Sequence, residues 1–315
     1  MSRNTEQGRS PTGGMSSDRQ IATLLPSATE IVYALGAEPV VTSHECDHPP
    51  AAAGKPDANR ARVDPTAAAG EIDTQVQAAD ESGGVYEIRG DVLEAAEPDL
   101  VVSQGICDVC AVDEVLVREA IDEHGLDCEL LTTDPHSLAD LYDDIERIGA
   151  ALDCEDRARE LVSRLRSRVA AVESRIPDRE PKRVAVFDWT DPVMIAGHWI
   201  PGMVERLGGE FGLQEPEAAS RPFEWETVRE YDPEIVVVAP CGFELDQTDE
   251  NFDDLTDREG WADLTAVRND RVYAVDGHGL MNRPGPRLVE SFETLAWCLY
   301  PDEFERPAGG VAKRW

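Results

Sequence analysis

The chain has 315 residues, and its 64 aspartates and glutamates against 29 lysines and arginines give a formal net charge of −35. A surface of that sign repels phosphate backbones and anionic headgroups, which makes nucleic acid a poor partner. No segment approaches the roughly 20 apolar residues that a bilayer-spanning helix needs, so we expect no membrane insertion.

The acidic residues are dispersed along the chain, and the only lysines are Lys55, Lys182 and Lys313. Because 41% of the residues are apolar, disorder does not account for the charge. Dense carboxylates keep a protein hydrated when the screening length falls to about 3 Å in molar salt. The composition therefore indicates a halophilic protein with the acidic composition of a salt-accumulating organism, and the charge is interpreted as adaptation rather than function.

The first 20 residues are polar, and we expect them to form a disordered tail with no signal peptide and no lipid-anchor cysteine. Seven cysteines are present, an odd number that favours free or metal-bound thiols in a reducing compartment. The sequence as it stands therefore predicts a cytoplasmic location.

Short β-branched runs alternate with helical patterns from residue 21 to residue 136, which predicts an N-terminal α/β lobe with a parallel sheet. Ser27 fits as the N-cap of the first helix, with Glu30 three residues later. The expected strands are 21–25, 40–43, 100–103 and 128–131, and the expected helical segments are 26–35, 72–79, 91–96 and 112–124.

From 137 to 176 the apolar residues recur with a period near 3.6, which predicts a long helix with a bend near Asp153. A helix of that length outgrows one sheet layer and fits a connection between two lobes. The α/β pattern begins again over 177–303, and 304–315 is a tail. The expected strands there are 183–187, 193–196, 235–239 and 272–275, and the expected helices are 201–207, 225–231 and 287–300. The predicted fold class is α/β, with two Rossmann-like lobes and a cleft between them.

Four cysteines, Cys46, Cys107, Cys110 and Cys241, follow predicted strands. Ligands of open parallel sheets bind beyond the carboxyl ends of the strands, so these thiols are candidates for a site. The Cys107-x-x-Cys110 pair can hold a metal ion or form a redox disulfide, and all four thiolates would suit zinc or an iron–sulfur cluster. The alternative is that they are buried as small hydrophobic side chains.

Polar residues around two other motifs are candidates for ligand contact. His44, Glu45 and Asp47 flank Cys46, and imidazole can ligate a metal while a carboxylate orients it. His198 and Trp199 follow an extended segment, and an indole offers a flat apolar wall. In the competing interpretation, the loop side chains satisfy their own backbone and Trp199 packs in the core.

Asn282 and Arg283 precede the last helix, and the planar guanidinium of Arg283 could pair with carboxylate or amide groups of a ligand. Helix capping with solvent exposure is the alternative. No nucleophile elbow and no phosphate-binding glycine loop is found. The sequence therefore favours a binding protein over an enzyme.

Several motifs resemble one known family. They are Ile-Ala-Thr-Leu-Leu-Pro-Ser-Ala-Thr-Glu (21–30), Ser-His-Glu-Cys-Asp-His-Pro (43–49), Leu-Glu-Ala-Ala-Glu-Pro-Asp (93–99), Ala-Gly-His-Trp (196–199), Ala-Pro-Cys-Gly-Phe (239–243) and Val-Tyr-Ala-Val-Asp-Gly (272–277). Over roughly 21–301 the chain is similar to the helical-backbone substrate-binding proteins of iron-chelate and cobalamin ABC importers, and most similar to the branch labelled cobalamin-binding protein. The resemblance implies two lobes bridged by one long helix, a bulky ligand in the cleft, little lobe closure and an ABC permease as partner.

Two hypotheses follow. In the first, a corrinoid such as cobalamin or a related metal chelate is held in the cleft. Its contacts are Ser27, His44, Glu45, Asp47, His198, Trp199, Asn282 and Arg283. In the second, Cys46, Cys107, Cys110 and Cys241 hold zinc or an iron–sulfur cluster in a cytoplasmic chaperone, sensor or redox protein.

Overall fold

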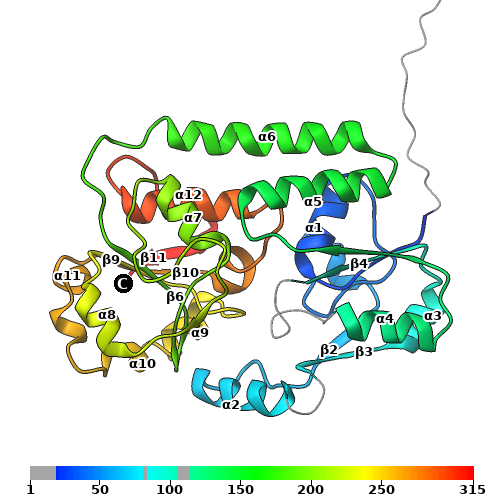
Figure 1. The fold of residues 1–315 in the computed structure, drawn as a ribbon, viewed down its shortest axis with the longest axis horizontal. Helices are drawn as coiled ribbons and strands as arrows, with labels where there is room; N and C mark the ends of the chain where they lie inside the picture. The colour runs from blue at the N-terminus through cyan, green and yellow to red at the C-terminus, as the bar shows by residue number, and fades with distance from the viewer. Residues whose placement is uncertain (1–18, 81–83, 106–113) are drawn as a thin grey trace, which may run out of the picture.

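The computed structural model describes residues 19–80, 84–105 and 114–315. The chain forms two lobes, each with its own sheet, and a pair of helices runs along one side of both (Figure 1). The predicted α/β class with mostly parallel sheets is confirmed. No helix of the described ranges is long and apolar enough to cross a membrane.

The N-terminal lobe is built on a parallel three-stranded sheet in the order β1-β4-β5. Strand β1 and the central strand β4 are fully buried, as expected for strands covered on both faces, whereas the edge strand β5 is only partly buried. The expected strand 40–43 is present only as isolated parallel bridges at Val41 and Thr42. The elements are β1 (Ile21–Thr23), α1 (Pro26–Ala34), β2 (Asn59–Ala61), α2 (Ala69–Asp80), β3 (Tyr86–Ile88), α3 (Gly90–Ala96), β4 (Leu100–Gln104), α4 (Glu114–Glu123) and β5 (Glu129–Thr133).

The C-terminal lobe contains a six-stranded sheet in the order β11-β10-β9-β6-β7-β8. Its central strands β10, β9 and β6 are parallel, and the remaining strands are antiparallel. The elements are β6 (Val184–Thr190), β7 (Val193–Ile195), α7 (Trp199–Arg206), β8 (Arg221–Pro222), α8 (Trp225–Tyr231), β9 (Ile235–Val238), α9 (Leu245–Glu250), α10 (Asp253–Thr256), α11 (Thr265–Arg268), β10 (Val272–Val275), α12 (Leu288–Leu299) and β11 (Ala312–Arg314).

The single long helix expected over 137–176 is two helices, α5 (Leu138–Ala151) and α6 (Glu155–Glu173). The chain reverses between them, where Asp153 has φ +53°, and the two helices pack against each other (Figure 1). A Cβ on Gly149 would lie 2.4 Å from the Cβ of Ala158, so this glycine permits the close approach. The apolar period continues through the reversal of the chain. For that reason the sequence pattern did not reveal the reversal.

The two helices belong to different lobes. Helix α5 packs against α1 in the N-terminal lobe, whereas α6 packs against α12 in the C-terminal lobe. The Arg168 guanidinium on α6 donates to both carboxylate oxygens of Glu293 on α12, at 3.0 and 2.7 Å. The α5–α6 pair therefore connects the lobes as a packed unit rather than as a free linker.

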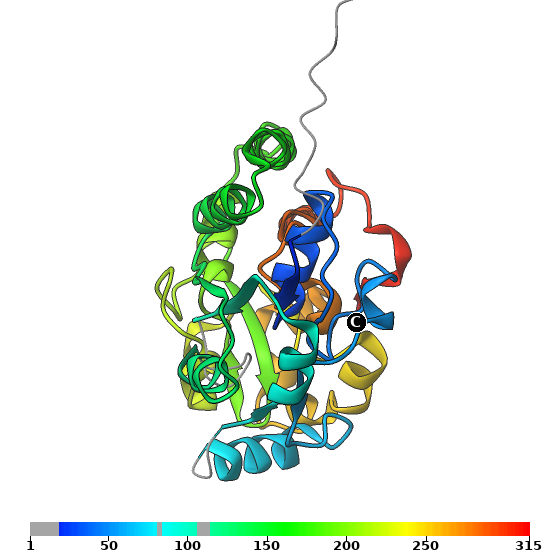
Figure 2. The same ribbon diagram turned by 90° about the vertical axis from the view of Figure 1, so that its right-hand side faces the viewer.

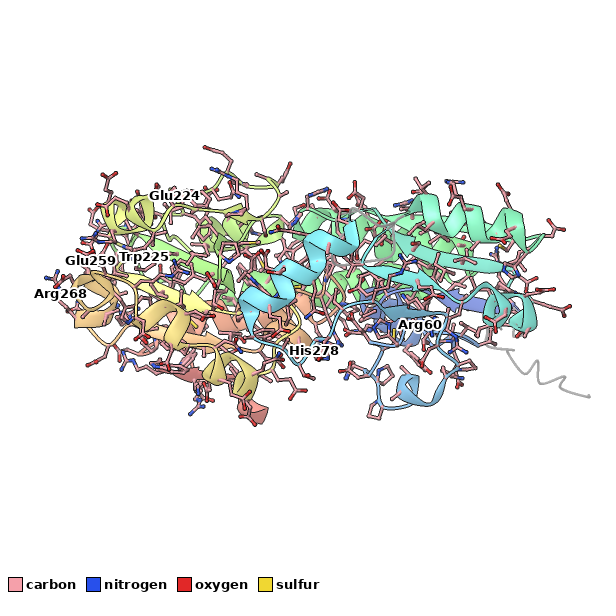
Figure 3. The ribbon with its side chains drawn as sticks, turned by 90° about the horizontal axis from the view of Figure 1, so that it is seen from below. Arg60, Glu224, Trp225, Glu259, Arg268 and His278 are labelled. Carbon is pink, nitrogen blue, oxygen red and sulfur yellow. The ribbon has the colours of Figure 1, made fainter. Side chains whose placement is uncertain are left out.

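Helix α2 leaves the N-terminal lobe between β2 and β3 and reaches the C-terminal lobe. Figures 1 and 2 place it at the end of the molecule opposite α5 and α6, and in Figure 3 it crosses the boundary between the lobes. Ala69 and Ile72 of α2 form a small buried cluster with Trp189 and Phe243 of the other lobe. The Ala69 amide donates to Asn251 Oδ1 at 2.9 Å.

Glycine substitutions test the close packing of α5 on α6. Gly149→Ala should lower the free energy of unfolding by about 1–3 kcal/mol, because the added methyl overpacks the contact with Ala158. Gly202→Ala on α7 is the matched control, because a Cβ there meets nothing within 4 Å. That control should gain up to about 1 kcal/mol from helix propensity. Urea unfolding in molar salt measures both, and a stabilised Gly149→Ala would contradict the packing.

Candidate functional site

The predicted loop residues at 44–47 and the predicted residues before α12 meet at the boundary between the lobes. Arg283, which is 5% exposed, donates to an Asp47 carboxylate oxygen and to the Glu45 carbonyl, the latter at 3.2 Å. The Nε2 atom of His278 lies 2.8 Å from Arg283 Nη2 and 3.1 Å from Asp47 Oδ2. Figure 3 shows His278 close to this boundary.

A second arginine strengthens the same contact. Arg287 donates twice to Glu30, at 3.0 and 2.6 Å, and Glu30 is buried in α1. Glu30 also lies 3.9 Å from Arg283 Nη1. We call Glu30, Asp47, His278, Arg283 and Arg287 the Arg283 cluster. Its acids come from one lobe and its bases from the other, so it is an ionic lock between the lobes.

The cluster changes the ionisation of its members. Burial by itself would raise the pKa of Asp47, but hydrogen bonds from His278 and Arg283 outweigh it and hold the pKa below its usual range. For Arg287, burial lowers the pKa, and the carboxylate of Glu30 more than compensates and raises it. The contacts therefore favour the ionised forms of Asp47 and Arg287.

Four predicted ligand contacts are used in joining the lobes or holding loops. The carboxylate of Asp47 and the guanidinium of Arg283 pair with each other across the lobes. Ser27 is buried, and a Cβ on Gly285 would lie 3.3 Å from its Cα, so the two backbones are in close contact. Asn282 donates to the Ala239 and Gly277 carbonyls at 3.0 and 3.1 Å. The polar groups of Asp47, Asn282 and Arg283 thus have structural partners, and Ser27 lies inside α1, where Leu25 and not Ser27 is the N-cap.

The His44 loop is also held internally. Asn59 Oδ1 accepts from the His44 amide at 3.1 Å and lies 2.9 Å from His44 Nδ1. The Tyr86 hydroxyl lies 3.5 Å from Glu45 Oε1. Strands β2 and β3 therefore position this loop, while the Glu45 side chain remains 39% exposed and accessible.

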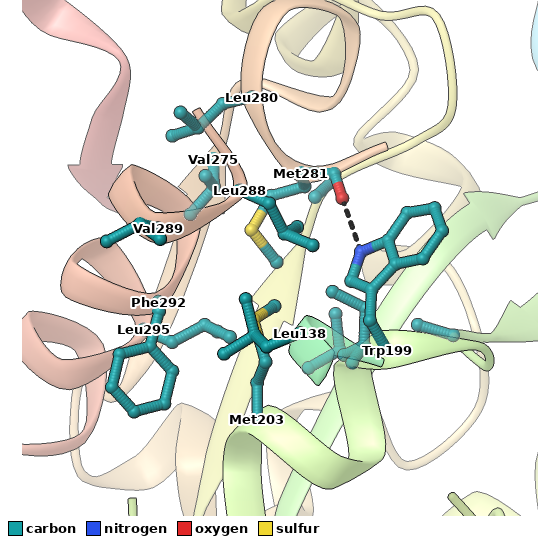
Figure 4. Close-up of a cluster of buried hydrophobic side chains, with 14 of the residues drawn as sticks. Leu138, Trp199, Met203, Val275, Leu280, Met281, Leu288, Val289, Phe292 and Leu295 are labelled. Atoms are coloured by element: carbon teal, nitrogen blue, oxygen red, sulfur yellow. Dashed lines mark hydrogen bonds between the residues drawn. The ribbon is translucent and has the colours of Figure 1, made fainter. Parts of the chain in front are cut away.

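Trp199 lies in the hydrophobic core rather than on a ligand-facing surface. Its indole is buried among apolar side chains of α7 and α12, and its Nε1 atom donates to the Met281 carbonyl at 3.0 Å (Figure 4). The expected role as a flat wall for a ligand is thus replaced by packing, the alternative that the sequence left open.

The thiolate site is not assembled among the described residues. Cys46 is buried against Thr29 Oγ1 at 3.0 Å, and burial raises the pKa of its thiol to about 11, so it is protonated at neutral pH. Cys241 follows β9 and is partly exposed. Cys107 and Cys110 lie outside the described residues. Within 19–80, 84–105 and 114–315, no group of three or more His, Cys, Asp or Glu side chains could hold a metal ion.

His198 is placed as expected, before α7, and meets a histidine that the sequence analysis missed. His136 follows β5, and its ring centroid lies 5.6 Å from that of His198. Burial and the neighbouring His136 lower the pKa of His198. The segment Thr-Asp-Pro-His (133–136) follows a predicted strand, which is the signal that could have identified His136.

Asp188, near the end of β6, is a further acid of the C-terminal sheet and is partly buried. Burial raises the pKa of its carboxyl to about 6 against a hydrogen bond from Ser220. Its Oδ1 atom has no hydrogen-bond partner in the described part of the chain.

Comparisons with known proteins agree with this architecture. A family model described as "Periplasmic binding protein" matches residues 21–278. An uncharacterized ABC transporter substrate-binding lipoprotein of Bacillus subtilis, YvrC, is 26% identical over 296 residues, which are 91% of this chain and 82% of that protein.

Solved structures share the fold at low sequence identity. The vitamin B12 binding protein BtuF of Vibrio cholerae has a TM-score of 0.65 and 19% identity, covering 90% of this chain and 97% of that one. A periplasmic heme binding protein from Pseudomonas aeruginosa has a TM-score of 0.69 and 19% identity, covering 93% and 96%. A possible iron-binding solute-binding protein from Staphylococcus epidermidis has a TM-score of 0.66 and 22% identity, covering 90% and 98%.

The expected cytoplasmic location is wrong, because the matching family model describes periplasmic proteins and the relative from B. subtilis is a lipoprotein. The cysteine argument behind that expectation also weakens, since Cys46, Cys154 and Cys298 are buried. A buried thiol is protected from oxidation, so an odd number of cysteines does not require a reducing compartment.

Removal of Arg283 tests the ionic lock. Arg283→Met should lower the free energy of unfolding by about 2–3 kcal/mol at neutral pH, because Glu30 and Asp47 lose a buried cationic partner and Asp47 is only half buried. Arg60→Met, which breaks the exposed pair with Glu87, should change it by less than about 1 kcal/mol.

The ionic lock also predicts how the free energy of unfolding depends on pH. The folded-state pKa of Asp47 is depressed, so its stabilising contribution is present above the unfolded pKa near 4 and is lost as the pH falls below it. Urea unfolding between pH 3 and 7 should show a smaller acid-induced loss in Arg283→Met than in the wild type. An equal loss in both proteins would contradict the role of Arg283.

Proposed function

The chain belongs to the periplasmic binding protein family, and from this we propose that it is the substrate-binding component of an ABC importer. We propose that its substrate is a metal chelate, a corrinoid such as cobalamin or a related one, bound where the two lobes meet. The proposed partner is an ABC permease, and no catalytic step is assigned.

The observation that carries the proposal is the meeting of strand-end residues from the two sheets. His136 follows β5 and faces His198, and His278 follows β10 and contacts Asp47. In α/β proteins, ligands bind beyond the carboxyl ends of parallel strands. His136 and His278 follow parallel strands, one in each sheet, and each contacts a residue of the other lobe, which supports a ligand shared between the lobes.

The connection between the lobes supports binding with little lobe closure. The Arg283 cluster and the packed α5–α6 pair each join the lobes, and separating the lobes widely would expose the charges of Glu30 and Arg287. A preformed site loses less conformational entropy on binding than one that must close. This rigidity suits a bulky, rigid ligand such as a macrocyclic chelate.

Helix α2 covers the same region from one side. Its apolar residues Ala69 and Ile72 pack on Trp189 and Phe243, which lie at or beyond the ends of β6 and β9. Gln247 Nε2 also donates to the Pro65 carbonyl at 2.7 Å, before α2 begins. We therefore propose that α2 is part of the wall of the substrate site.

The relatives support the same class of substrate. Solved structures with this fold include proteins named for binding vitamin B12 and heme, which are planar metal macrocycles. The thiolate alternative is not favoured, because burial keeps Cys46 protonated. The acidic surface suits a protein that works in concentrated salt.

Direct titration tests the proposed function. Purified full-length protein in molar salt is titrated with cyanocobalamin, with haemin and with a ferric trihydroxamate, and tryptophan fluorescence is recorded. We expect one of these chelates to bind with one-to-one stoichiometry, and its metal-free form to bind more weakly. If no chelate of the three classes binds, the proposed substrate class is wrong.

A substitution on α2 tests its place in the wall. Ile72→Asp inserts a charge into the contact with Trp189 and Phe243 and should weaken binding of the chelate by about tenfold or more, since a buried unpaired charge costs several kcal/mol. Thr74→Asp on the exposed face of α2 is the matched control and should bind as the wild type does. Equal affinities of the two variants for the chelate would contradict the proposal that α2 forms part of the wall of the substrate site.

A further inference from the structure

Two imidazoles, one from each lobe, face each other at the boundary between the lobes. His136 follows β5 and His198 precedes α7, and their ring planes differ by 32° at a centroid separation of 5.6 Å. Leu138, at the start of α5, belongs to the same buried cluster as Trp199 and Met203 of the other lobe (Figure 4). The two rings therefore lie beside an apolar contact between the β5–α5 connection and α7.

The second ring nitrogen of His136 has no acceptor for a proton. Its Nε2 atom lies 3.0 Å from Asp134 Oδ1. A carboxylate can only accept, so Nε2 carries the proton of the neutral ring and Nδ1 carries the lone pair. The Nδ1 atoms of His136 and His198 are both buried without a hydrogen-bond partner in the described part of the chain. A proton added at either Nδ1 atom would form a buried N–H group with no acceptor, which is unfavourable.

The backbone holds His198 in a conformation that favours glycine, with φ +51° and ψ −117°. The Ile200 amide donates to the Gly197 carbonyl at 3.0 Å, as in a type II′ turn with His198 at its first central position. The His198 amide also donates to the Ala218 carbonyl at 2.6 Å. Glycine is preferred at this position of such a turn, so backbone stability does not explain why an imidazole is placed here against His136.

The charges that act on His198 among the described residues are those of His136 and Asp134. Burial is the largest cause that lowers the pKa of His198, and a positive charge on His136 lowers it further. The carboxylate of Asp134 acts in the opposite sense and is outweighed. Because Asp134 is a single acid with an exposed side chain, it can compensate one positive charge on the pair of rings but not two.

Three further acids lie on the segments around the pair, and they are Asp140 on α5, Asp188 on β6 and Glu217 in the loop after α7. The His136 amide donates to Asp140 Oδ2 at 3.1 Å, and the Glu217 amide donates to the His198 carbonyl at 3.0 Å. Burial raises the pKa of Asp188 to about 6, so its contribution to stability is lost as the pH rises toward that value. This dependence is opposite in sign to that of a histidine whose pKa is lowered, and a test must separate the two.

We propose that the contact between His136 and His198 is an acid-sensitive joint between the lobes, closed while at most one ring is protonated and opened when both rings are. The Arg283 cluster stays closed over the same range, because the pKa of Asp47 is held below its usual range. The opening is therefore local, and it moves the β5–α5 connection away from the start of α7.

The direction of the pH dependence follows from the lowered pKa of His198. The closed contact is fully stable above the ordinary pKa of histidine, 6.5, and loses stability as the pH falls below it. Molar salt screens exposed charges within about 3 Å but screens buried charges much less, so this contact responds to pH in concentrated salt. A consequence that rests on the proposed function is that a chelate bound where the lobes meet loses affinity in acid.

Substitutions that remove each titrating ring while preserving its surroundings test the joint. His198→Asn suits the positive φ, because asparagine is common in type II′ turns. His136→Gln keeps a side-chain N–H for Asp134. His124→Gln is the matched control, because His124 is also paired with a carboxylate, Glu94, at 2.9 Å. Asp188 is unchanged in all of these proteins, so its titration cancels in the comparison.

Hydrogen exchange of the full-length protein in molar salt measures the opening at pH 7.5 and 5.5. After correction for intrinsic exchange rates, protection over 133–140 and 196–203 should fall by about tenfold in the wild type and in His124→Gln, since each pKa unit between open and closed states is a factor of ten. His136→Gln and His198→Asn should show the same protection at both pH values. In histidine-labelled protein followed by NMR, the pKa of His198 should rise toward its usual value in His136→Gln.

The outcomes separate this inference from the proposed function. Protection that is independent of pH in the wild type, or that is lost equally in all four proteins, overturns the joint. Cyanocobalamin and a ferric trihydroxamate are titrated at both pH values, and a chelate that binds should bind the wild type about tenfold more weakly at pH 5.5, in proportion to the loss of protection. If the joint opens as expected but neither chelate binds at pH 7.5, the inference stands and the proposed function fails.

Discussion

The pairing of buried charges across the lobes is the constraint on which the arrangement of the molecule depends. Glu30 is buried in α1, and its ion-pair partners among the described residues are Arg287 and Arg283, which come from the other lobe. A buried carboxylate without its partner is strongly unfavourable. Separating the two lobes would therefore cost free energy, because Glu30 would lose its cationic partners. The lock thus fixes the lobes in one relative position, and that position brings the strand-end residues of both sheets together.

Much of the fold could be predicted from local sequence. The sequence predicts α8 and β10 with the observed bounds, because Trp225–Tyr231 and Val272–Val275 are bounded runs with clear apolar patterns. It misses β2 and β3, which are three-residue antiparallel strands with few buried side chains. It also merges α5 and α6, because a reversal at Asp153 leaves the apolar period intact. Periodicity reports the burial of a face and not the direction of the chain.

The candidate site was less predictable than the fold, and the reason is again long-range contact. Residues 44–47 and 283, which the sequence selects as candidates, are in contact with each other across the lobes, while their role in binding a ligand stays a prediction. The sequence does not reveal that Arg283 forms an ion pair with Asp47, or that the Trp199 side chain packs in the core. Those outcomes depend on partners more than 80 residues away in the chain. His136 is overlooked because its significance arises only from the position of His198.

The net charge limits how such a site can attract its substrate. In molar salt the screening length is about 3 Å, so the acidic surface neither steers nor repels a chelate over distance. Affinity for the proposed substrate then depends on short-range contacts that salt does not screen, chiefly the burial of apolar area. Within the Arg283 cluster, Glu30 and Arg283 are buried, so salt screens their attraction much less than it screens the pairs on the surface.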